Sequence, residues 1–358
     1  MIDKLIEQGR SFAVWRIPGE DKLHFRMQST GKSCLLYDIN ELNGRSGFVI
    51  APFNVSERHP IVLIEPDSLE FSSESIDSFI RMKTSFHSDE TELSSEWNEK
   101  ERYAYRFSLF TKPLLDGTQD KLVLSRSLSI KRENGFSPNE AFKAAVKRYV
   151  RSYVYLCHTP ETGTWLGSTP EILLSGERGA WHTVALAGTQ PIVDGNTPTN
   201  WDKKNIEEQQ IVASYIKDRL SSLAIKADER GPYTARAGEV CHLKSDFFFS
   251  LPNPEKLGEL LKLLHPTPAV CGLPKMEAYD FIIKNEGYDR SYYSGFIGWL
   301  DPKGRSDLYV NLRCMNIGEC NLTLYAGGGL LAASKLEEEW HETEIKLDTM
   351  RRLIMNQI

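Results

Sequence analysis

The sequence lacks the features that define several large classes of protein. Its six cysteines are scattered, with no Cys-x-x-Cys pair and no cluster of cysteine and histidine, so we expect reduced packing thiols and no zinc site. No apolar run approaches the roughly 20 residues of a membrane-spanning helix, and the first residues lack the apolar segment of a secretion signal. These absences predict a cytoplasmic protein that does not enter a membrane.

An excess of basic charge is also missing. The formal net charge is -6 and the pI is about 5.8, with no basic run interleaved with aromatic residues, so we expect no nucleic-acid partner. The glycine spacings match neither a Walker loop nor a dinucleotide fingerprint, so nucleotide binding is not predicted either.

What the chain contains is typical of a globular protein. Its 358 residues, 41% of them hydrophobic and 26% charged, are enough to bury a large core. Residues 12–66 alternate apolar and polar side chains in short runs, which predicts a meander of strands. A polar stretch rich in Ser and Glu follows from Asp67 to about Glu101, and we interpret it as a flexible or variable segment.

The remainder mixes helices and strands irregularly. Ser137-Pro-Asn-Glu140 predicts a helix start, with Ser137 as cap and Glu140 completing a capping box. Further elements are expected as strands at 121–125, 153–157, 164–167, 308–313 and 322–325, and as helices at 202–223, 255–264 and from about 334. This uneven order predicts an α+β fold, one large domain in which antiparallel β-sheets pack together with peripheral helices.

Two of the predicted helices carry acids where apolar residues belong. Counting back by four along the apolar stripe of the 202–223 helix leads to Glu208, and the stripe of the last helix leads back through Lys346 and Glu342 to Glu339. A first-turn acid is by itself most often a solvated residue favoured by the helix dipole. Carboxylates that converge from two helices, however, suit a hard cation, and we predict a Mg²⁺ site.

Three glycine-containing segments each follow a strand-like run. They are Gly167-Ser-Thr-Pro-Glu171, Leu186-Ala-Gly-Thr189 and Ala326-Gly-Gly-Gly329, and we interpret them as turns. Glycine also lets a backbone approach a ligand closely, so a role in binding stays open beside the turn interpretation.

Six motifs, in order from about Lys121 to the end, resemble those of the chorismate-utilising enzymes: the three glycine segments, His265-Pro-Thr-Pro-Ala-Val-Cys-Gly272, Leu312-Arg-Cys314 and Glu339-Trp-His-Glu-Thr343. That family includes isochorismate synthase, salicylate synthase, anthranilate synthase component I and aminodeoxychorismate synthase. The resemblance implies one chorismate-binding domain over residues 1–358, with a variable half at 1–110 and a motif-bearing catalytic half at 118–358.

The resemblance also implies catalytic roles. Lys121 is similar to the lysine that activates the attacking water, and a lysine base must lose its proton, which requires desolvation or a nearby cation. Glu171 is similar to the general acid that protonates the departing hydroxyl, a task that at neutral pH requires burial to raise the carboxyl pKa. The alternatives are a strand-edge lysine and a turn acid of no catalytic importance.

Binding roles follow from the same resemblance. Glu208 and Glu342 are similar to the principal Mg²⁺ ligands, with Glu339 close by. Arg313 is similar to the arginine that binds the enolpyruvyl carboxylate, and Lys346 would add positive charge, although it could equally form a simple helix pair with Glu342. Backbone N–H groups near four further residues would complete the substrate pocket: Gly188, Thr189, Gly327 and Gly328.

Three positions favour one reaction within the family. Lys121 stands where anthranilate synthases carry glutamine, and Ala187 where aminodeoxychorismate synthases carry a nucleophilic lysine. Ala269 stands where salicylate synthases tend to have threonine. The resemblance thus implies a Mg²⁺-dependent isochorismate synthase, an isomerase acting on chorismate as a monomer without a glutamine amidotransferase subunit.

Some residues depart from the family pattern. Gln209 replaces a histidine after Glu208, Asn205 stands where an acid is common, and Thr169 replaces serine. These changes leave two alternatives open: salicylate synthase, and a catalytically lapsed homologue that only binds a chorismate-like metabolite. The pathway that takes the product, to menaquinone, a siderophore or salicylate, is likewise open.

Overall fold

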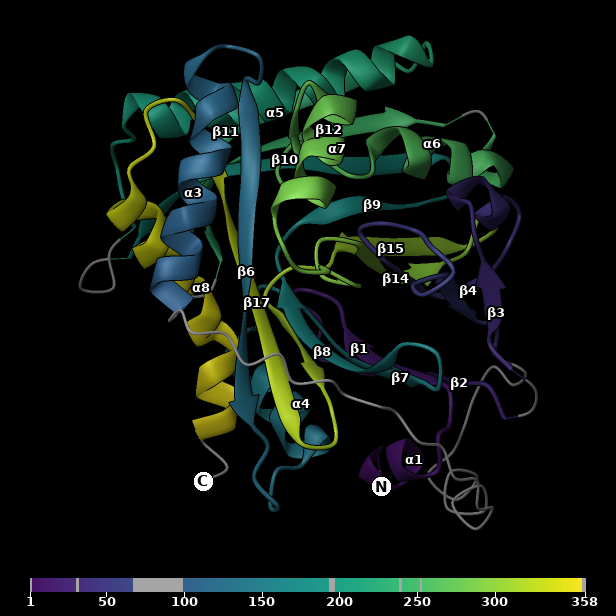
Figure 1. The fold of residues 1–358 in the computed structure, drawn as a ribbon. Helices are drawn as coiled ribbons and strands as arrows, with labels where there is room; N and C mark the ends of the chain where they lie inside the picture. Colours follow the sequence, from purple (N-terminus) through teal and green to yellow (C-terminus); the bar gives the residue numbers. More distant parts are fainter. Residues whose placement is uncertain are drawn as a thin grey trace.

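The protein folds into two large antiparallel sheets with helices packed outside them (Figure 1). The computed structural model describes residues 2–29, 32–66, 99–192, 197–237, 240–251 and 253–355. The first sheet has the order β13-β6-β17-β16-β8-β7-β1-β2. Its strands are β1 (Phe12–Arg16), β2 (His24–Met27), β6 (Lys121–Lys131), β7 (Tyr153–Thr159), β8 (Gly163–Thr169), β13 (Gly272–Leu273), β16 (Cys314–Ile317) and β17 (Asn321–Leu330).

The second sheet has the order β11-β12-β10-β9-β15-β14-β4-β5-β3. Its strands are β3 (Cys34–Leu36), β4 (Gly47–Ala51), β5 (Ile61–Ile64), β9 (Ile172–Glu177), β10 (Ala180–Pro191), β11 (Ala227–Ala237), β12 (Val240–Ser250), β14 (Phe296–Leu300) and β15 (Arg305–Val310). The inner faces of the two sheets share a core that is rich in aromatic side chains, among them Trp15, Phe48, Tyr153, Trp165 and Tyr309.

Helices cover the outer faces, and one flank of the sandwich carries two more. The helical segments are α1 (Ile2–Glu7), η1 (Ile39–Leu42), α3 (Glu99–Leu115), α4 (Pro138–Arg148), α5 (Lys203–Ser222), η2 (Pro254–Lys256), α6 (Leu257–Leu264), α7 (Lys275–Asn285) and α8 (Leu336–Met355). The helices α1, α4 and α8 pack on the first sheet, whereas α5 and α6 pack on the second. The helices α3 and α7 pack beside β6, as Figure 1 shows. The α+β prediction is therefore confirmed.

The predicted helices agree with α4, α5, α6 and α8, whose starts depend on local caps and spacing, whereas α1, α3 and α7 were not predicted. The Ser137 side chain accepts a hydrogen bond from the Glu140 N–H at 3.1 Å, as a helix cap should. The Glu140 carboxylate is 2.7 Å from Lys143 Nζ, a pairing that the capping-box prediction did not foresee. Asp202 caps α5, where the long helix was expected. Within the described ranges, no helix is both long and apolar enough to cross a bilayer.

The described strands of the first hundred residues are divided between the two sheets. The strands of residues 12–66 do not form one meander, because β1 and β2 belong to the first sheet and β3, β4 and β5 to the second. Alternation identifies which side chains share a face but not which strands pair. The polar stretch from Asp67 to about Glu101 lies outside the described residues up to position 98, and its last three residues begin α3.

The turn interpretation was wrong for two of the three glycine segments. Residues 186–189 lie inside β10 and residues 326–329 lie inside β17, both within paired ladders. Only the first segment leaves its strand, with Thr169 ending β8 and Ile172 beginning β9. The glycines mark places where other groups approach a strand, not places where the chain turns.

Candidate active site

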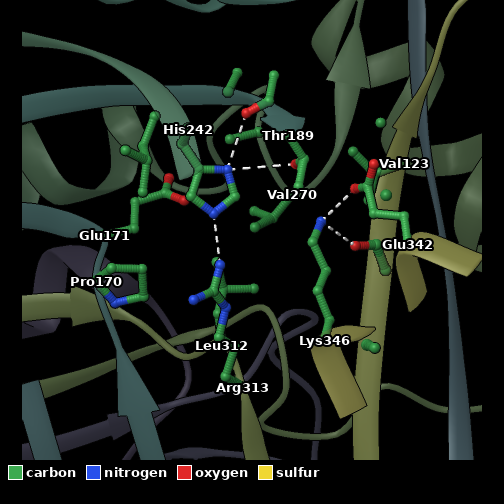
Figure 2. Close-up of a pocket in the computed structure, with 18 of the residues that line it drawn as sticks. Val123, Pro170, Glu171, Thr189, His242, Val270, Leu312, Arg313, Glu342 and Lys346 are labelled. Atoms are coloured by element: carbon green, nitrogen blue, oxygen red, sulfur yellow. Dashed lines mark hydrogen bonds and ion pairs between the residues drawn. The ribbon is translucent and has the colours of Figure 1, made fainter. Parts of the chain in front are cut away.

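A cavity lies where β17 of the first sheet faces β10 and β12 of the second (Figure 2). Nearly all of the predicted site residues line it, although they are far apart in sequence. The lining residues among them are Glu171, Gly188, Thr189, Glu208, Ala269, Arg313, Gly327, Gly328, Glu342 and Lys346. Lys121 and Glu339 lie directly behind this wall, next to the positions of Gly329 and Gly328. The fold therefore brings the predicted site residues together in and around one cavity.

The helix α5 is fixed to the cavity by a bulge in β10. The register of β10 shifts between Ala187 and Thr189, and Gly188 takes a positive φ of 72° that favours glycine. Three consecutive N–H groups of this bulge donate to three side chains of α5. Ala187 donates to Gln209 Oε1 at 2.9 Å, Gly188 to Glu208 Oε2 at 3.2 Å, and Thr189 to Asn205 Oδ1 at 2.8 Å.

These contacts correct one prediction and explain two departures from the family pattern. The backbone N–H groups of Gly188 and Thr189 are occupied by α5 and are not free to bind a substrate. Gln209 and Asn205 serve as helix anchors on the strand, since Gln209 Nε2 also donates to the Ala185 carbonyl at 3.1 Å. Both residues are buried, and Asn205 Nδ2 donates to Asp202 Oδ2 at 2.6 Å within the start of α5, so its oxygen is the end of the amide that binds the strand.

Each carboxylate of the predicted cation site is paired with a lysine. The distances are 2.8 Å from Glu208 Oε1 to Lys121 Nζ, 2.5 Å from Glu339 Oε1 to Lys204 Nζ, and 2.6 Å from Glu342 Oε1 to Lys346 Nζ. Lys121 is fully buried, so its charge depends on Glu208 for compensation. Burial acts to raise the pKa of Glu208, but the charges of Lys121, Lys204 and Lys346 outweigh it and lower the pKa.

The glycines of β17 allow these acids to approach the strand. A Cβ atom at Gly328 would lie 3.2 Å from both Glu339 Oε2 and Glu342 Oε1. A Cβ atom at Gly329 would overlap Glu208 Oε1 and lie 2.7 Å from Lys121 Cε. The acids of α8 and of α5 therefore approach β17 at two consecutive positions that only glycine leaves open, and Glu208 and Glu342 both line the cavity.

The donor set suits a hard cation. The candidate ligands are carboxylate oxygens, which Mg²⁺ takes in proteins, although each carboxylate is paired with a lysine in this structure. Glu339 Oε2 is buried without a hydrogen-bond partner among the described residues, and burial together with the charge of Glu342 raises the pKa of Glu339. A divalent cation would satisfy that oxygen. The described residues contain no ready-made group of three ligands, so the carboxylates would have to move closer together to hold a cation.

Glu171 has the environment expected of a general acid. Its side chain is 2% exposed, and Thr267 Oγ1 donates to its Oε1 at 3.3 Å. Burial raises the pKa of Glu171 to about 7, although Thr267 and the charges of Lys121, Lys346 and Arg313 act in the opposite direction. About half of the carboxyl groups are therefore protonated at pH 7, where an ordinary glutamate would be almost fully ionised. In Figure 2 it lies on the His242 and Arg313 side of the cavity.

Arg313 is held by a histidine that the sequence analysis missed. Its Nη2 is 2.5 Å from His242 Nε2, and its Nη1 donates to the Ala237 carbonyl at 2.5 Å. His242 Nδ1 lies 2.9 Å from the Gly188 carbonyl (Figure 2). Burial, Arg313 and Lys346 lower the pKa of His242 well below its usual value. A neutral imidazole that donates through Nδ1 and accepts at Nε2 satisfies both contacts.

Nothing in the sequence pattern distinguishes His242 from other strand residues. Tyr293 and Tyr325 also line the cavity unpredicted, with their rings stacked at 5.3 Å. Lys346 does more than pair within its helix, because its Nζ also donates to the Gly327 carbonyl at 2.8 Å. Thr169 has a structural role, since its hydroxyl donates to the Val310 carbonyl at 2.6 Å.

The fold and this cavity define a class of enzyme. The family model described as chorismate binding enzyme matches residues 64–355, and the chain belongs to that family. The match includes the candidate site residues from Lys121 to Lys346.

Named relatives agree with the family. The chain is 32% identical over 257 residues to isochorismate synthase DhbC of Bacillus subtilis, an alignment that covers 67% of this chain and 64% of that protein. It is 30% identical over 242 residues to isochorismate synthase EntC of Escherichia coli, covering 64% and 61%. The chain therefore spans about three fifths of the length of these relatives in the alignments.

A solved structure supports the fold over a greater length. The structure of a 2,3-dihydroxybenzoate-specific isochorismate synthase, DhbC from Bacillus anthracis, superposes with a TM-score of 0.77 and covers 98% of both chains at 24% identity. At that identity the likeness establishes the architecture, namely two antiparallel sheets with outer helices.

Proposed function

We propose that this protein is a Mg²⁺-dependent isochorismate synthase, which adds water at C2 of chorismate and expels the C4 hydroxyl to give isochorismate. The observation that carries the proposal is the cavity itself. It combines a buried carboxyl with a pKa of about 7, Glu171, with the cationic side chains of Arg313 and Lys346 and with carboxylates suited to Mg²⁺. An anionic substrate that loses a hydroxyl needs an acid to protonate the hydroxyl, and positive charge from side chains and from a metal ion to hold its carboxylates.

Each group has a defined task in this proposal. Glu171 donates its proton to the departing hydroxyl, while Lys121 takes a proton from the attacking water in its neutral form. Lys121 is ion-paired with Glu208, so a cation held by Glu208 would compete for that carboxylate and favour loss of the lysine proton before the reaction. Arg313, oriented by His242, and Lys346 hold substrate carboxylate charge. Glu208 and Glu342, with Glu339 close by, would hold Mg²⁺. When bound, the ion supplies positive charge for a substrate carboxylate while the ring double bond shifts.

The names of the relatives favour isochorismate as the product. They include synthases named for different products, such as the vibriobactin-specific and the salicylate biosynthesis proteins, so they do not select a pathway for this chain. Ala269 lines the cavity with a methyl group only, which removes a polar contact that could retain isochorismate for a second step. We propose that the enzyme releases isochorismate and works as a cytoplasmic monomer without an amidotransferase subunit.

Turnover of chorismate tests the proposal. The purified chain is incubated with chorismate and Mg²⁺, the products are separated by chromatography, and pyruvate is followed with a lactate dehydrogenase couple. We expect a reversible mixture of chorismate and isochorismate without pyruvate. In the Lys121→Ala variant, turnover should fall by about 10²-fold or more while the fold is retained.

Two other outcomes would replace the proposal. Stoichiometric pyruvate and salicylate would identify a salicylate synthase. Binding of chorismate without turnover, in the presence of Mg²⁺, would identify a catalytically lapsed homologue.

A further inference from the structure

Thr267 contacts Glu171 from behind the wall of the cavity. Its Oγ1 donates a hydrogen bond to Glu171 Oε1 at 3.3 Å, and the residue is 4% exposed. Ala269 and Val270, two and three positions further along the chain, line the cavity, whereas Thr267 does not. Thr267 therefore reaches the candidate acid without reaching the space for a substrate.

The segment that carries Thr267, between α6 and β13, is held in place by buried hydrogen bonds. The Thr267 carbonyl accepts from the N–H groups of Val270 and Cys271, both at 3.0 Å. Arg290 Nη1 donates to the Val270 carbonyl at 2.7 Å, and Arg290 Nε is 2.6 Å from Glu286 Oε2 in a buried ion pair. The fold itself therefore sets the position of the Thr267 hydroxyl.

The contact makes the two carboxyl oxygens of Glu171 unequal. Oε1 accepts from Thr267, while Oε2 makes no hydrogen bond to any described residue. A hydroxyl that donates to one oxygen of a carboxylic acid favours the proton on the other oxygen, because a protonated oxygen is the poorer acceptor. Glu171 lines the cavity (Figure 2), so Oε2 is the oxygen left for a substrate.

Other ionisable groups share the cavity or its wall with Glu171. They are Lys121 of β6, Glu208 of α5, His242 of β12, Arg313, and Glu342 and Lys346 of α8. Tyr293 and Tyr325 also line the cavity, and burial raises the pKa of both. Among the described residues, no hydrogen bond or ion pair joins Glu171 to a carboxylate of the proposed cation site. The Thr267 hydroxyl is neutral, so its removal tests the contact without changing a charge.

We propose that Thr267 is a positioning residue of the acid step, whose hydroxyl donates to Glu171 Oε1 and so keeps the acidic proton on Oε2, on the side of the substrate. The proposal rests on the proposed function, in which Glu171 protonates the departing hydroxyl. In that step the O–H bond at Oε2 and the C4–O bond of the substrate break, a water molecule leaves, and the proton of the attacking water passes to Lys121. Glu171 is left as a carboxylate, which the same hydrogen bond stabilises.

The dependence of kcat on pH tests the assignment in Thr267→Val, Thr267→Ser and the control Thr183→Val. Thr183 is also buried, but its hydroxyl donates to the Leu173 carbonyl at 2.7 Å. Thr267→Val should lower kcat at about pH 6 by about 3- to 10-fold, because the proton is no longer held on one oxygen. Its alkaline decline should move up by about 0.5–1 pH unit, because the ionised carboxylate loses a donor. Thr267→Ser keeps the hydroxyl and should stay close to the wild type, and Thr183→Val should keep the wild-type pH profile.

A titration without substrate gives a second measurement that does not depend on turnover. The full chain is isotope-labelled at the glutamate carboxyl carbons, and the Glu171 signal is identified in NMR spectra by its absence from Glu171→Gln. The midpoint of this signal should rise by about 0.5–1 pH unit in Thr267→Val and stay unchanged in Thr183→Val.

The outcomes separate this proposal from the proposed function. If the wild type converts chorismate, then Thr267→Val with wild-type kcat and midpoint, or Thr267→Ser with the same losses as Thr267→Val, would overturn the role of Thr267 alone. A midpoint that falls in Thr267→Val would show that Thr267 accepts the proton of the acid, and would overturn the assignment as well. A wild type that does not convert chorismate would overturn the proposed function, while a raised midpoint in Thr267→Val would still establish that Thr267 donates to Glu171.

Discussion

At the scale of single residues, burial converts ordinary side chains into reactive ones. Glu171 is an acid in a short link between two strands, and its surroundings raise its pKa to about 7. The protonated form is the general acid, so activity should decline as pH rises through that value, by about tenfold per unit well above it. The dependence of kcat on pH measures this directly.

The Glu171→Gln variant should lose about 10²-fold or more in kcat and show no such decline. The same variant should lose activity but gain stability relative to the wild type. A carboxyl whose folded pKa is raised stabilises at low pH and loses that contribution as pH rises through about 7, so the advantage of Gln should grow from about pH 4.5 to 7 and then level off. Glu177→Gln, at an exposed position, is the control. Activity at pH 9 equal to that at pH 6 in the wild type would remove the acid assignment.

At the scale of elements, the position of α5 depends on its hydrogen bonds to β10. Gln209 uses both ends of its amide on the Ala187 N–H and the Ala185 carbonyl. Gln209→Ala should leave both backbone groups unpaired and lower the free energy of unfolding by about 2–4 kcal/mol. Gln210→Ala, one residue further and exposed, should change it by less than about 0.5 kcal/mol. Urea denaturation compares the two, and equal effects would contradict the anchoring role.

The glycine run of β17 allows a second comparison at this scale. Gly329→Ala places a methyl group onto Glu208 and Lys121, whereas Gly328→Ala meets Glu339 and Glu342 at 3.2 Å, a distance that a small shift can relieve. We expect kcat/KM to fall by about 10²-fold or more in Gly329→Ala and less in Gly328→Ala. Similar activity of both variants would show that the close approach is not needed for catalysis.

At the scale of the whole molecule, a cation would join the two layers. Glu208 is on α5, which packs on the second sheet, and Glu342 is on α8, which packs on the first. Mg²⁺ at about 100 times its dissociation constant should stabilise the fold by about 2.7 kcal/mol and raise Tm by a few degrees. Differential scanning calorimetry with added Mg²⁺, then with chelator, measures the change, and chelator should also abolish activity.

Glu342→Ala should remove most of the Mg²⁺-induced shift, while Glu338→Ala should keep it. Glu338 is on the same helix but exposed, where it pairs with Lys335. If the Tm and the activity of the wild type are the same in Mg²⁺ and in chelator, the proposed cation site is wrong.

The sequence by itself determined what is local and periodic. The cap at Ser137 and the length of α5 followed from neighbouring residues. The inward direction of Glu208 and Glu339 followed from helical spacing, and both side chains are indeed buried. These features are predictable because a helix face or a cap depends on residues within a few positions of one another. The order of the motifs was enough to identify the family and to select the candidate site residues.

Tertiary structure decided which distant groups meet. Alternation cannot select strand partners, so the division of β1 to β5 between two sheets was not predictable. The sequence pattern around the glycines of β10 and β17 predicts turns, because the acids and amides that approach these glycines do so only once α5 and α8 are docked. His242 has no local signal, since its role comes from the Gly188 carbonyl and Arg313, residues 54 and 71 positions away. Contacts of that range depend on the packing of the two sheets, which no local pattern records.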